Sequence, residues 1–236
     1  MTSGVAPIAR STRGRRSKSP LGCVMRRINA RAVLGLTTVS SKTSSAAMAT
    51  KNARFSYLPL LTIPAAGRDG RIRRVLLAEL FGSGGRNAEA VARRLSGASL
   101  VEENTGEIKA DLRRAETSPR KGIVGRYVAE STVWGSVTPV VLPGRDDYRQ
   151  RKAHGLILKA LAQAGYTTPI LEIQLQEEPV FPGAERARAY RAPAYLKQYP
   201  RTHAIITFAK PVRGPVAIGG GRHVGLGTFA TLSASN

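Results

Sequence analysis

The chain has 236 residues, with 37 Lys or Arg against 15 Asp or Glu and a formal net charge of +22. This imbalance favours polyanionic partners, because contacts with phosphates release condensed counterions. The chain has one cysteine (Cys23), which excludes a disulfide framework, and with only three histidines it is unlikely to hold a metal centre. It has no apolar run of the roughly 20 residues that span a membrane. We therefore expect no metal, no cofactor and no membrane contact.

The first 52 residues differ in composition from the rest of the chain. Residues 1–68 contain 12 Lys or Arg and no acidic residue, and the first 50 are rich in Ser, Thr, Ala and Arg with little periodicity. This composition is typical of disorder, so residues 1–52 are interpreted as a basic, disordered arm or linker. An organelle transit peptide and a start placed too early, with Met48 close to the better-patterned sequence, are the alternatives.

Residues 53–133 are expected to form a first folded unit. Pro59 interrupts the first apolar run of this region, which indicates an edge strand because proline cannot donate to a neighbouring strand. Apolar residues after Asn87 recur at helical spacing, so Asn87 is expected to cap a short helix. The predicted elements are a strand over 55–63, a strand over 72–81, the helix from Asn87, and strands near 99–102 and 123–128.

Residues 134–236 are expected to form a second unit. The predicted elements are a strand over 136–142, a helix from an N-cap at Asp146 to a stop at Gly165, and strands over 168–175 and 202–208. In the last strand, alternation places Ala204 and Ile206 on one face and His203 on the other. The order strand, helix, strand, polar excursion, strand is typical of a ferredoxin-like α+β unit with an antiparallel sheet.

A glycine-rich loop over 214–227 lies near the C-terminal end. Its six glycines permit positive φ and close approach, so successive N–H groups can form an anion-binding nest. Arg222 and His223 at its centre add a permanent charge and a titratable group. The alternative is a glycine-rich β-hairpin without a ligand, and a nucleotide P-loop is excluded because no Gly-Lys-Ser/Thr follows. The glycines expected to approach a phosphate backbone are Gly219, Gly220, Gly221, Gly225 and Gly227.

Four segments, in order along the chain, resemble one protein family. They are YLPL followed by DGRI within 57–72, WGSVTPVVLPG at 134–144, THAIITFAKPVRGP at 202–215 and GPVAIGGGRHVGLGTF at 214–229. The last segment resembles the C-terminal glycine-rich loop of the CRISPR-associated RAMP superfamily. Together the four are similar to the repeat-processing part of the fused RAMP subunit of type I-G (formerly I-U) systems.

The resemblance implies two ferredoxin-like (RRM-like) α+β units with antiparallel sheets, over 53–133 and 134–236, that grip a CRISPR repeat RNA. Processing members of the family cut without a metal: a 2′-hydroxyl attacks the adjacent phosphate and leaves a cyclic phosphate and a 5′-hydroxyl. The implied partners are repeat-derived CRISPR RNA and other subunits of an effector complex in the cytoplasm of a prokaryote. The alternatives are a RAMP subunit that caps the guide RNA without cutting, and a ribosomal RNA-binding protein.

The three histidines are the candidate proton carriers, because histidine titrates near neutrality. His223 is the first candidate, since it lies in the glycine-rich loop beside Arg222. His203 lies on the strand that precedes this loop, and an ordinary strand histidine packed beside Ile205 is the alternative. His154 lies in the predicted helix, where a half-buried structural histidine is the alternative.

Basic and aromatic residues supply the candidate RNA contacts. Arg222 and Arg213 are expected to clamp phosphate, because a guanidinium makes bidentate contacts. In the polar excursion before the last long strand, basic side chains alternate with tyrosines, which suits single-stranded RNA with unstacked bases. A solvated loop anchored by its tyrosines is the alternative. The candidates in this excursion are Arg186, Arg188, Arg191, Lys197, Tyr190 and Tyr195.

Overall fold

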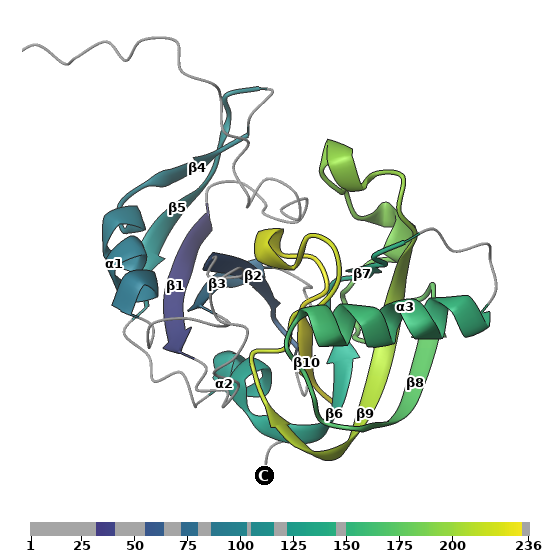
Figure 1. Ribbon diagram of the computed structural model, residues 1–236. Helices are drawn as coiled ribbons and strands as arrows, with labels where there is room; N and C mark the ends of the chain where they lie inside the picture. Colours follow the sequence, from purple (N-terminus) through teal and green to yellow (C-terminus); the bar gives the residue numbers. More distant parts are fainter. Residues whose placement is uncertain are drawn as a thin grey trace, which may run out of the picture.

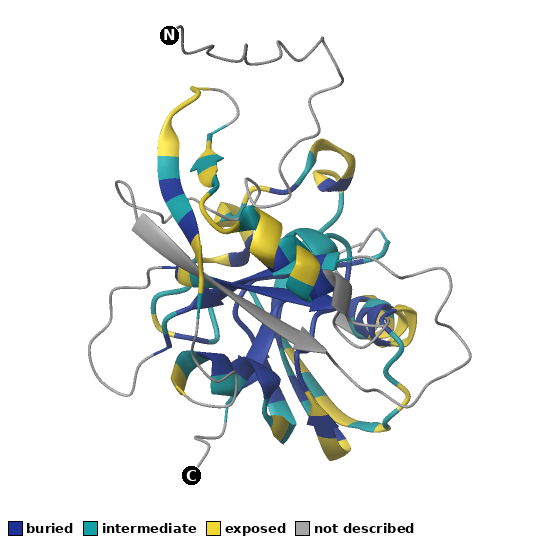
Figure 2. Ribbon diagram, turned by 90° about the vertical axis from the view of Figure 1, so that its left-hand side faces the viewer, coloured by how far each residue is buried: buried dark blue, intermediate teal, exposed yellow. Residues whose placement is uncertain are grey.

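Two β-sheets, each with an α-helix packed on one face, make up most of the described chain (Figure 1). The computed structural model describes residues 32–40, 55–63, 72–79, 86–102, 105–115, 122–144 and 150–232. Buried side chains fill the layers between each helix and its sheet and also the region where the two sheets meet (Figure 2).

The first sheet has edge strands that pair antiparallel and a central strand that pairs parallel. Its strands are β1 (Ala32–Ser40), β2 (Phe55–Leu61), β3 (Ile72–Glu79), β4 (Ser99–Val101) and β5 (Ile108–Arg114), in the spatial order β2-β3-β1-β5-β4. Helix α1 (Arg86–Leu95) packs Ala88 and Ala92 against Val75 and Leu77 of β3. The short helix near Asn87 and the edge position indicated by Pro59 are both confirmed, but the prediction that Asn87 caps the helix is wrong, because α1 begins at Arg86 and Asn87 is its second residue.

Strand β1 corrects the prediction that all of residues 1–52 form a disordered arm. Ala32–Ser40 pair parallel with β3 on one side and with β5 on the other. The first sheet is therefore mixed and not wholly antiparallel as expected. The nine residues hold no charge and several β-branched residues, which favour strands. The average composition of residues 1–52 does not reveal this short strand, because basic residues surround it. The rest of the predicted arm lies outside the described residues.

The second sheet is antiparallel throughout and matches the expected α+β unit. Its strands are β6 (Glu130–Ser136), β7 (Val140–Val141), β8 (Ile170–Gln176), β9 (Arg201–Arg213) and β10 (Phe229–Thr231), in the order β10-β6-β9-β7, with β8 also paired to β9. Ala204 and Ile206 are buried beneath helix α3 (Gln150–Gln163), as the alternation predicted. No helix among the described residues is long and apolar enough to cross a membrane.

Three predicted boundaries in this region have distinct outcomes. Helix α3 stops at Gly165 as expected. Gly165 has a φ of +83°, and its N–H donates to the Ala162 carbonyl. The Tyr166 N–H donates to the Leu161 carbonyl. The predicted strand over 136–142 is interrupted: β6 ends at Ser136 and β7 starts at Val140. The predicted cap Asp146 lies outside the described residues.

Helix α2 (Gly122–Val128) joins the two sheets and was wrongly predicted as a strand over 123–128. Its buried side chains, among them Val124 and Tyr127, pack in one cluster with residues of both sheets. From the first sheet come Leu58, Leu60, Leu76 and Ala78, and from the second unit Val137, Phe181, Ala217 and Ala230. Ile123, Val124, Tyr127 and Val128 suit a strand by type, so only the packing around them selects the helix.

Replacing Tyr127 with Phe tests this shared core. Tyr127 is fully buried and donates its hydroxyl to the Leu61 carbonyl at 3.0 Å. Because Tyr127→Phe removes that bond from the interior, we expect the free energy of unfolding to fall by about 1–3 kcal/mol in urea denaturation of the full chain. Tyr195→Phe, at an exposed tyrosine, should change it by less than about 0.5 kcal/mol. Equal effects of the two changes would contradict a structural role for the Tyr127 hydroxyl.

Candidate functional site

The glycine-rich loop runs from β9 to β10 and packs against the first sheet. Its short 3-10 helix η4 (Arg222–Val224) lies beside β2 (Figure 1). Gly225 has a φ of +89°, and a Cβ there would lie 2.7 Å from Pro59 Cδ on that strand. The loop therefore brings the C-terminal part of the chain onto the edge of the first sheet.

Most of the loop glycines serve packing within the protein. At Gly227, a Cβ would lie 1.9 Å from the Ile218 carbonyl oxygen, and at Gly219 it would lie 2.6 Å from the Val141 oxygen. At Gly220 and Gly221 the nearest atoms belong to Leu196 and Leu226. These close approaches explain the glycine content without a ligand.

Several loop amides are also occupied. The N–H groups of Gly220 and Gly227 donate to the carbonyls of Val141 and Pro139, and that of Ile218 donates to Gly227. The Thr138 hydroxyl donates to the Gly225 carbonyl at 2.9 Å. These three amides hold the loop in place and do not form the expected anion nest.

His223 sits at the contact between the loop and β2. Its Nδ1 lies 2.9 Å from the hydroxyl oxygen of Ser56, a fully buried residue of β2. The imidazole itself is half-buried. This partner of His223 was not found from the sequence, because Ser56 is 167 residues away and lies in an unremarkable strand.

Arg222 and His223 are adjacent in sequence but lie in different surroundings. Burial raises the pKa of Tyr166, and the nearby charge of Arg222 partly opposes that rise. The Tyr166 hydroxyl in turn donates to the Pro215 carbonyl at 3.2 Å. Arg222 therefore lies close to the second unit, whereas the His223 ring contacts a strand of the first.

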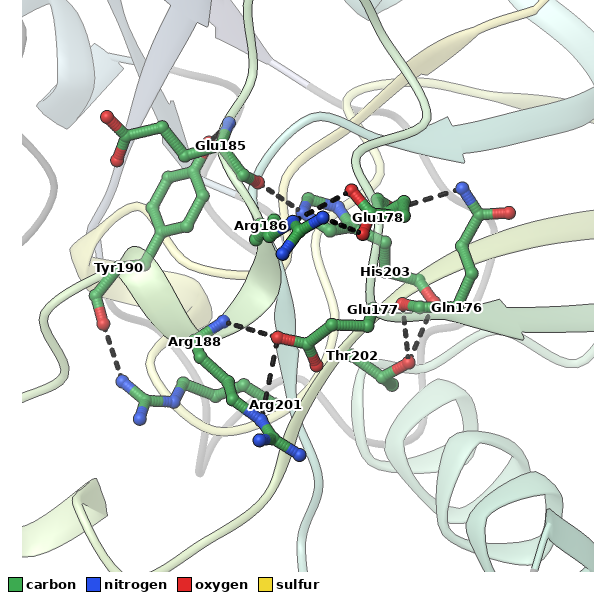
Figure 3. Close-up of polar contacts among 10 residues, drawn as sticks. All are labelled: Gln176, Glu177, Glu178, Glu185, Arg186, Arg188, Tyr190, Arg201, Thr202 and His203. Carbon is green, nitrogen blue, oxygen red and sulfur yellow. Dashed lines mark hydrogen bonds and ion pairs between the residues drawn. The ribbon is translucent and has the colours of Figure 1, made fainter.

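His203 is fully buried, and both of its ring nitrogens have partners; Figure 3 shows the one to Glu185. The Ala204 N–H donates to the Ser136 hydroxyl oxygen at 2.9 Å, so the hydroxyl can donate to His203 Nδ1, 3.0 Å away. His203 Nε2–H then donates to the Glu185 carbonyl at 2.9 Å. Burial lowers the pKa of His203. The network ties β9 to β6 and to the start of the excursion before β9.

The other two sequence candidates lie apart from this network. His154 is half-buried on α3, and Arg213 is exposed at the end of β9, opposite Glu130 of β6. In the part of the chain that the structure describes, no hydrogen bond or ring contact joins two of the three histidines. The structure therefore gives each histidine a separate environment.

The excursion over 177–200 divides its tyrosines between two roles. Tyr190 packs against a small core of Val141, Ala192, Leu196 and Leu226, donates to the Val137 carbonyl at 3.3 Å and lies edge-on to His203. Tyr199 packs against the same core. Both are anchors, as the alternative interpretation expected. Tyr195 is 67% exposed and remains available to a base.

The arginines of this excursion differ in their ionic contacts. Arg186 pairs with Glu178 at 2.8 Å, and Arg188 pairs with Glu177 at 3.6 Å (Figure 3). All four side chains are substantially exposed, so each pair contributes only about 0–1 kcal/mol. Arg191 and Lys197 are exposed beside Tyr195 in sequence.

Replacing Gly227 with Ala tests whether the loop depends on close packing. The residue has a φ of +63° and no room for a Cβ. We therefore expect Gly227→Ala to lower the free energy of unfolding by about 2–5 kcal/mol in urea denaturation. Gly155→Ala is the matched control, because a Cβ on that helical glycine meets nothing within 4 Å; it should stabilise by up to about 1 kcal/mol. A neutral Gly227→Ala would contradict the packing role.

The buried His203 predicts a pH dependence of stability. Because its pKa is lowered in the folded state, the unfolded chain takes up a proton near pH 6.5 that the folded chain resists. The stability that the folded protein gains from neutral His203 is fully present above about pH 6.5 and is lost as the pH falls toward the folded pKa. Over this range the free energy of unfolding changes by up to about 1.4 kcal/mol per pH unit. His203→Gln should remove this slope from urea unfolding measured between about pH 5 and 7. An unchanged slope in His203→Gln would contradict the proposal that His203 resists protonation in the folded state.

Comparison with known proteins yields one match. A family model described as CRISPR-associated protein, GSU0054 family, matches residues 14–231. No curated protein and no solved structure matches the chain. Since the match extends over nearly the whole sequence and over both sheets, the chain belongs to the GSU0054 family of CRISPR-associated proteins.

Proposed function

We propose that this protein binds CRISPR repeat RNA and cleaves precursor RNA within an effector complex, with His223 as the proton carrier. Family membership supports a CRISPR role, and the net charge of +22 supports a nucleic-acid partner. The same membership is incompatible with the ribosomal alternative. The observation that carries the catalytic part is the half-buried His223, held by the buried Ser56 where the loop meets β2.

The contact with Ser56 orients the imidazole of His223. Nδ1 is engaged with the Ser56 hydroxyl, and the proposed proton transfer with the substrate uses the other ring nitrogen, Nε2. His203 is less suited to this role, since its ring is fully buried and both nitrogens are bonded. We propose His203 as a residue that positions the excursion and not as a proton carrier.

The proposed reaction needs a base, an acid and a cation. The 2′-oxygen attacks the adjacent phosphorus after its proton is removed, the bond from phosphorus to the 5′-oxygen breaks, and that oxygen takes up a proton. The products are a 2′,3′-cyclic phosphate and a 5′-hydroxyl. Neutral His223 accepts the first proton, or its imidazolium donates the second. The other proton is exchanged with water or with a group of the RNA.

The exposed part of the excursion is the proposed single-strand contact. Tyr195 offers an exposed ring for a base, with Arg191 and Lys197 near it in sequence. The weak exposed pairs of Arg186 and Arg188 can be exchanged for RNA phosphates at little cost. Arg213 and Arg222 remain proposed phosphate contacts.

A cleavage assay with the full chain tests this proposal. The purified protein is incubated with its repeat RNA and excess chelator, and His223→Ala should lower the single-turnover cleavage rate by about 10²–10⁴-fold, with repeat affinity nearly unchanged. Ser56→Ala should reduce the rate less, because it loosens the ring without removing it. The control substrate carries one 2′-deoxy nucleotide at the scissile position and should not be cut.

Three results would contradict parts of the proposal. Tight repeat binding without cleavage by the wild type would identify a non-catalytic capping subunit. Undiminished cleavage by His223→Ala would exclude His223 as the proton carrier. Cleavage of the deoxy substrate would exclude attack by the 2′-hydroxyl.

A further inference from the structure

Described residues cover only part of the face of the first sheet opposite α1. On the β2 and β3 side, Leu58, Leu60, Leu76 and Ala78 are buried against α2 and the second unit. On the β5 side, Ala110 and Leu112 face α1, so Asp111 and Arg113 point to the opposite face. Arg113 is exposed there. This part of the face therefore presents a charged surface.

Strand register aligns two arginines across this face with a glycine between them. Arg74 of β3 and Arg113 of β5 both pair with Gly35 of the central strand β1. Arg74 also pairs with Leu60, a member of the core on the face opposite α1, so Arg74 and Arg113 point to the same side. Because glycine carries no side chain, nothing of β1 stands between them at that position.

The spacing suits a phosphate chain. Two strand separations place the Cα atoms of Arg74 and Arg113 about 10 Å apart, and two long guanidinium side chains can converge on one phosphate or hold two consecutive ones. Among the described residues, neither side chain makes a hydrogen bond or ion pair. The nearest charges on β5 are engaged: Asp111 accepts from the Ser99 hydroxyl at 2.6 Å, and Lys109 pairs with Glu102 at 3.1 Å.

The two arginines lie on the sheet face that also carries Ser56, the partner of His223. Ser56 lies beside Ala78 of β3, four residues along the strand from Arg74. That separation is about 13 Å. Leu76 and Ala78, which lie between these two positions on the same face, are buried in the shared core, so the two arginines and His223 would contact the RNA at separate points.

We infer that Arg74 and Arg113, on either side of Gly35, form a binding site for the phosphate backbone of single-stranded RNA on the first sheet. This site rests on the proposed function, because it adds a backbone contact for the same RNA. It extends that function with a third contact region, separate from the glycine-rich loop and from the excursion over 177–200.

The test compares two charge-matched double variants of the full chain. Arg74→Gln with Arg113→Gln removes the proposed site, and Arg93→Gln with Arg94→Gln removes two exposed charges from α1, on the opposite face. Affinity for a short oligouridine RNA is measured by fluorescence anisotropy over a range of salt concentrations. The first variant should lose at least about tenfold in affinity, and its salt slope should fall by about 0.7 for each phosphate released. The control should keep the wild-type slope.

The outcomes separate this inference from the proposed function. Equal losses in the two double variants would overturn the site, since they would show only the effect of overall charge. The wild type is also compared on its repeat RNA and on oligouridine. No preference for the repeat would contradict the proposed function, whereas a slope change confined to the Arg74 and Arg113 variant would still support the site.

Discussion

The shared apolar core between the two sheets is the contact on which the remaining structure depends. Leu58 and Leu76 of the first sheet, Tyr127 of α2 and Phe181 of the second unit belong to one buried cluster. Burial of such side chains contributes about 1.5–3 kcal/mol each, so this shared core holds the two sheets together. The relative position of β2 and the glycine-rich loop follows from this core.

The glycine-rich loop illustrates how packing and function share the same residues. Gly225 and Gly227 allow the chain to lie against β2 and against its own carbonyls. The consequence is a short helix, η4, whose His223 meets the buried Ser56 across two distant parts of the chain. Glycines that suggest a ligand nest in the sequence thus serve first to place a histidine.

Charge is distributed unevenly over the described surface. In the excursion, Arg186 and Arg188 are matched by Glu178 and Glu177, whereas Arg74 and Arg113 stand on a sheet face with no ion pair of their own among the described residues. Net charge favours RNA in general. In the proposed function, the path of the RNA depends on which cations have no ion pair within the protein.

The sequence by itself determined many of the local elements and the excess of positive charge. Periodicity predicted α1 and the buried face of β9, Gly165 marked the end of α3, and Pro59 indicated the edge strand, because these features depend on neighbouring residues alone. Tertiary structure decided the rest. It placed β1 at the centre of a sheet, made α2 a helix, enclosed His203 and joined His223 to Ser56. Each of these depends on contacts between residues far apart in sequence, which composition and periodicity do not encode.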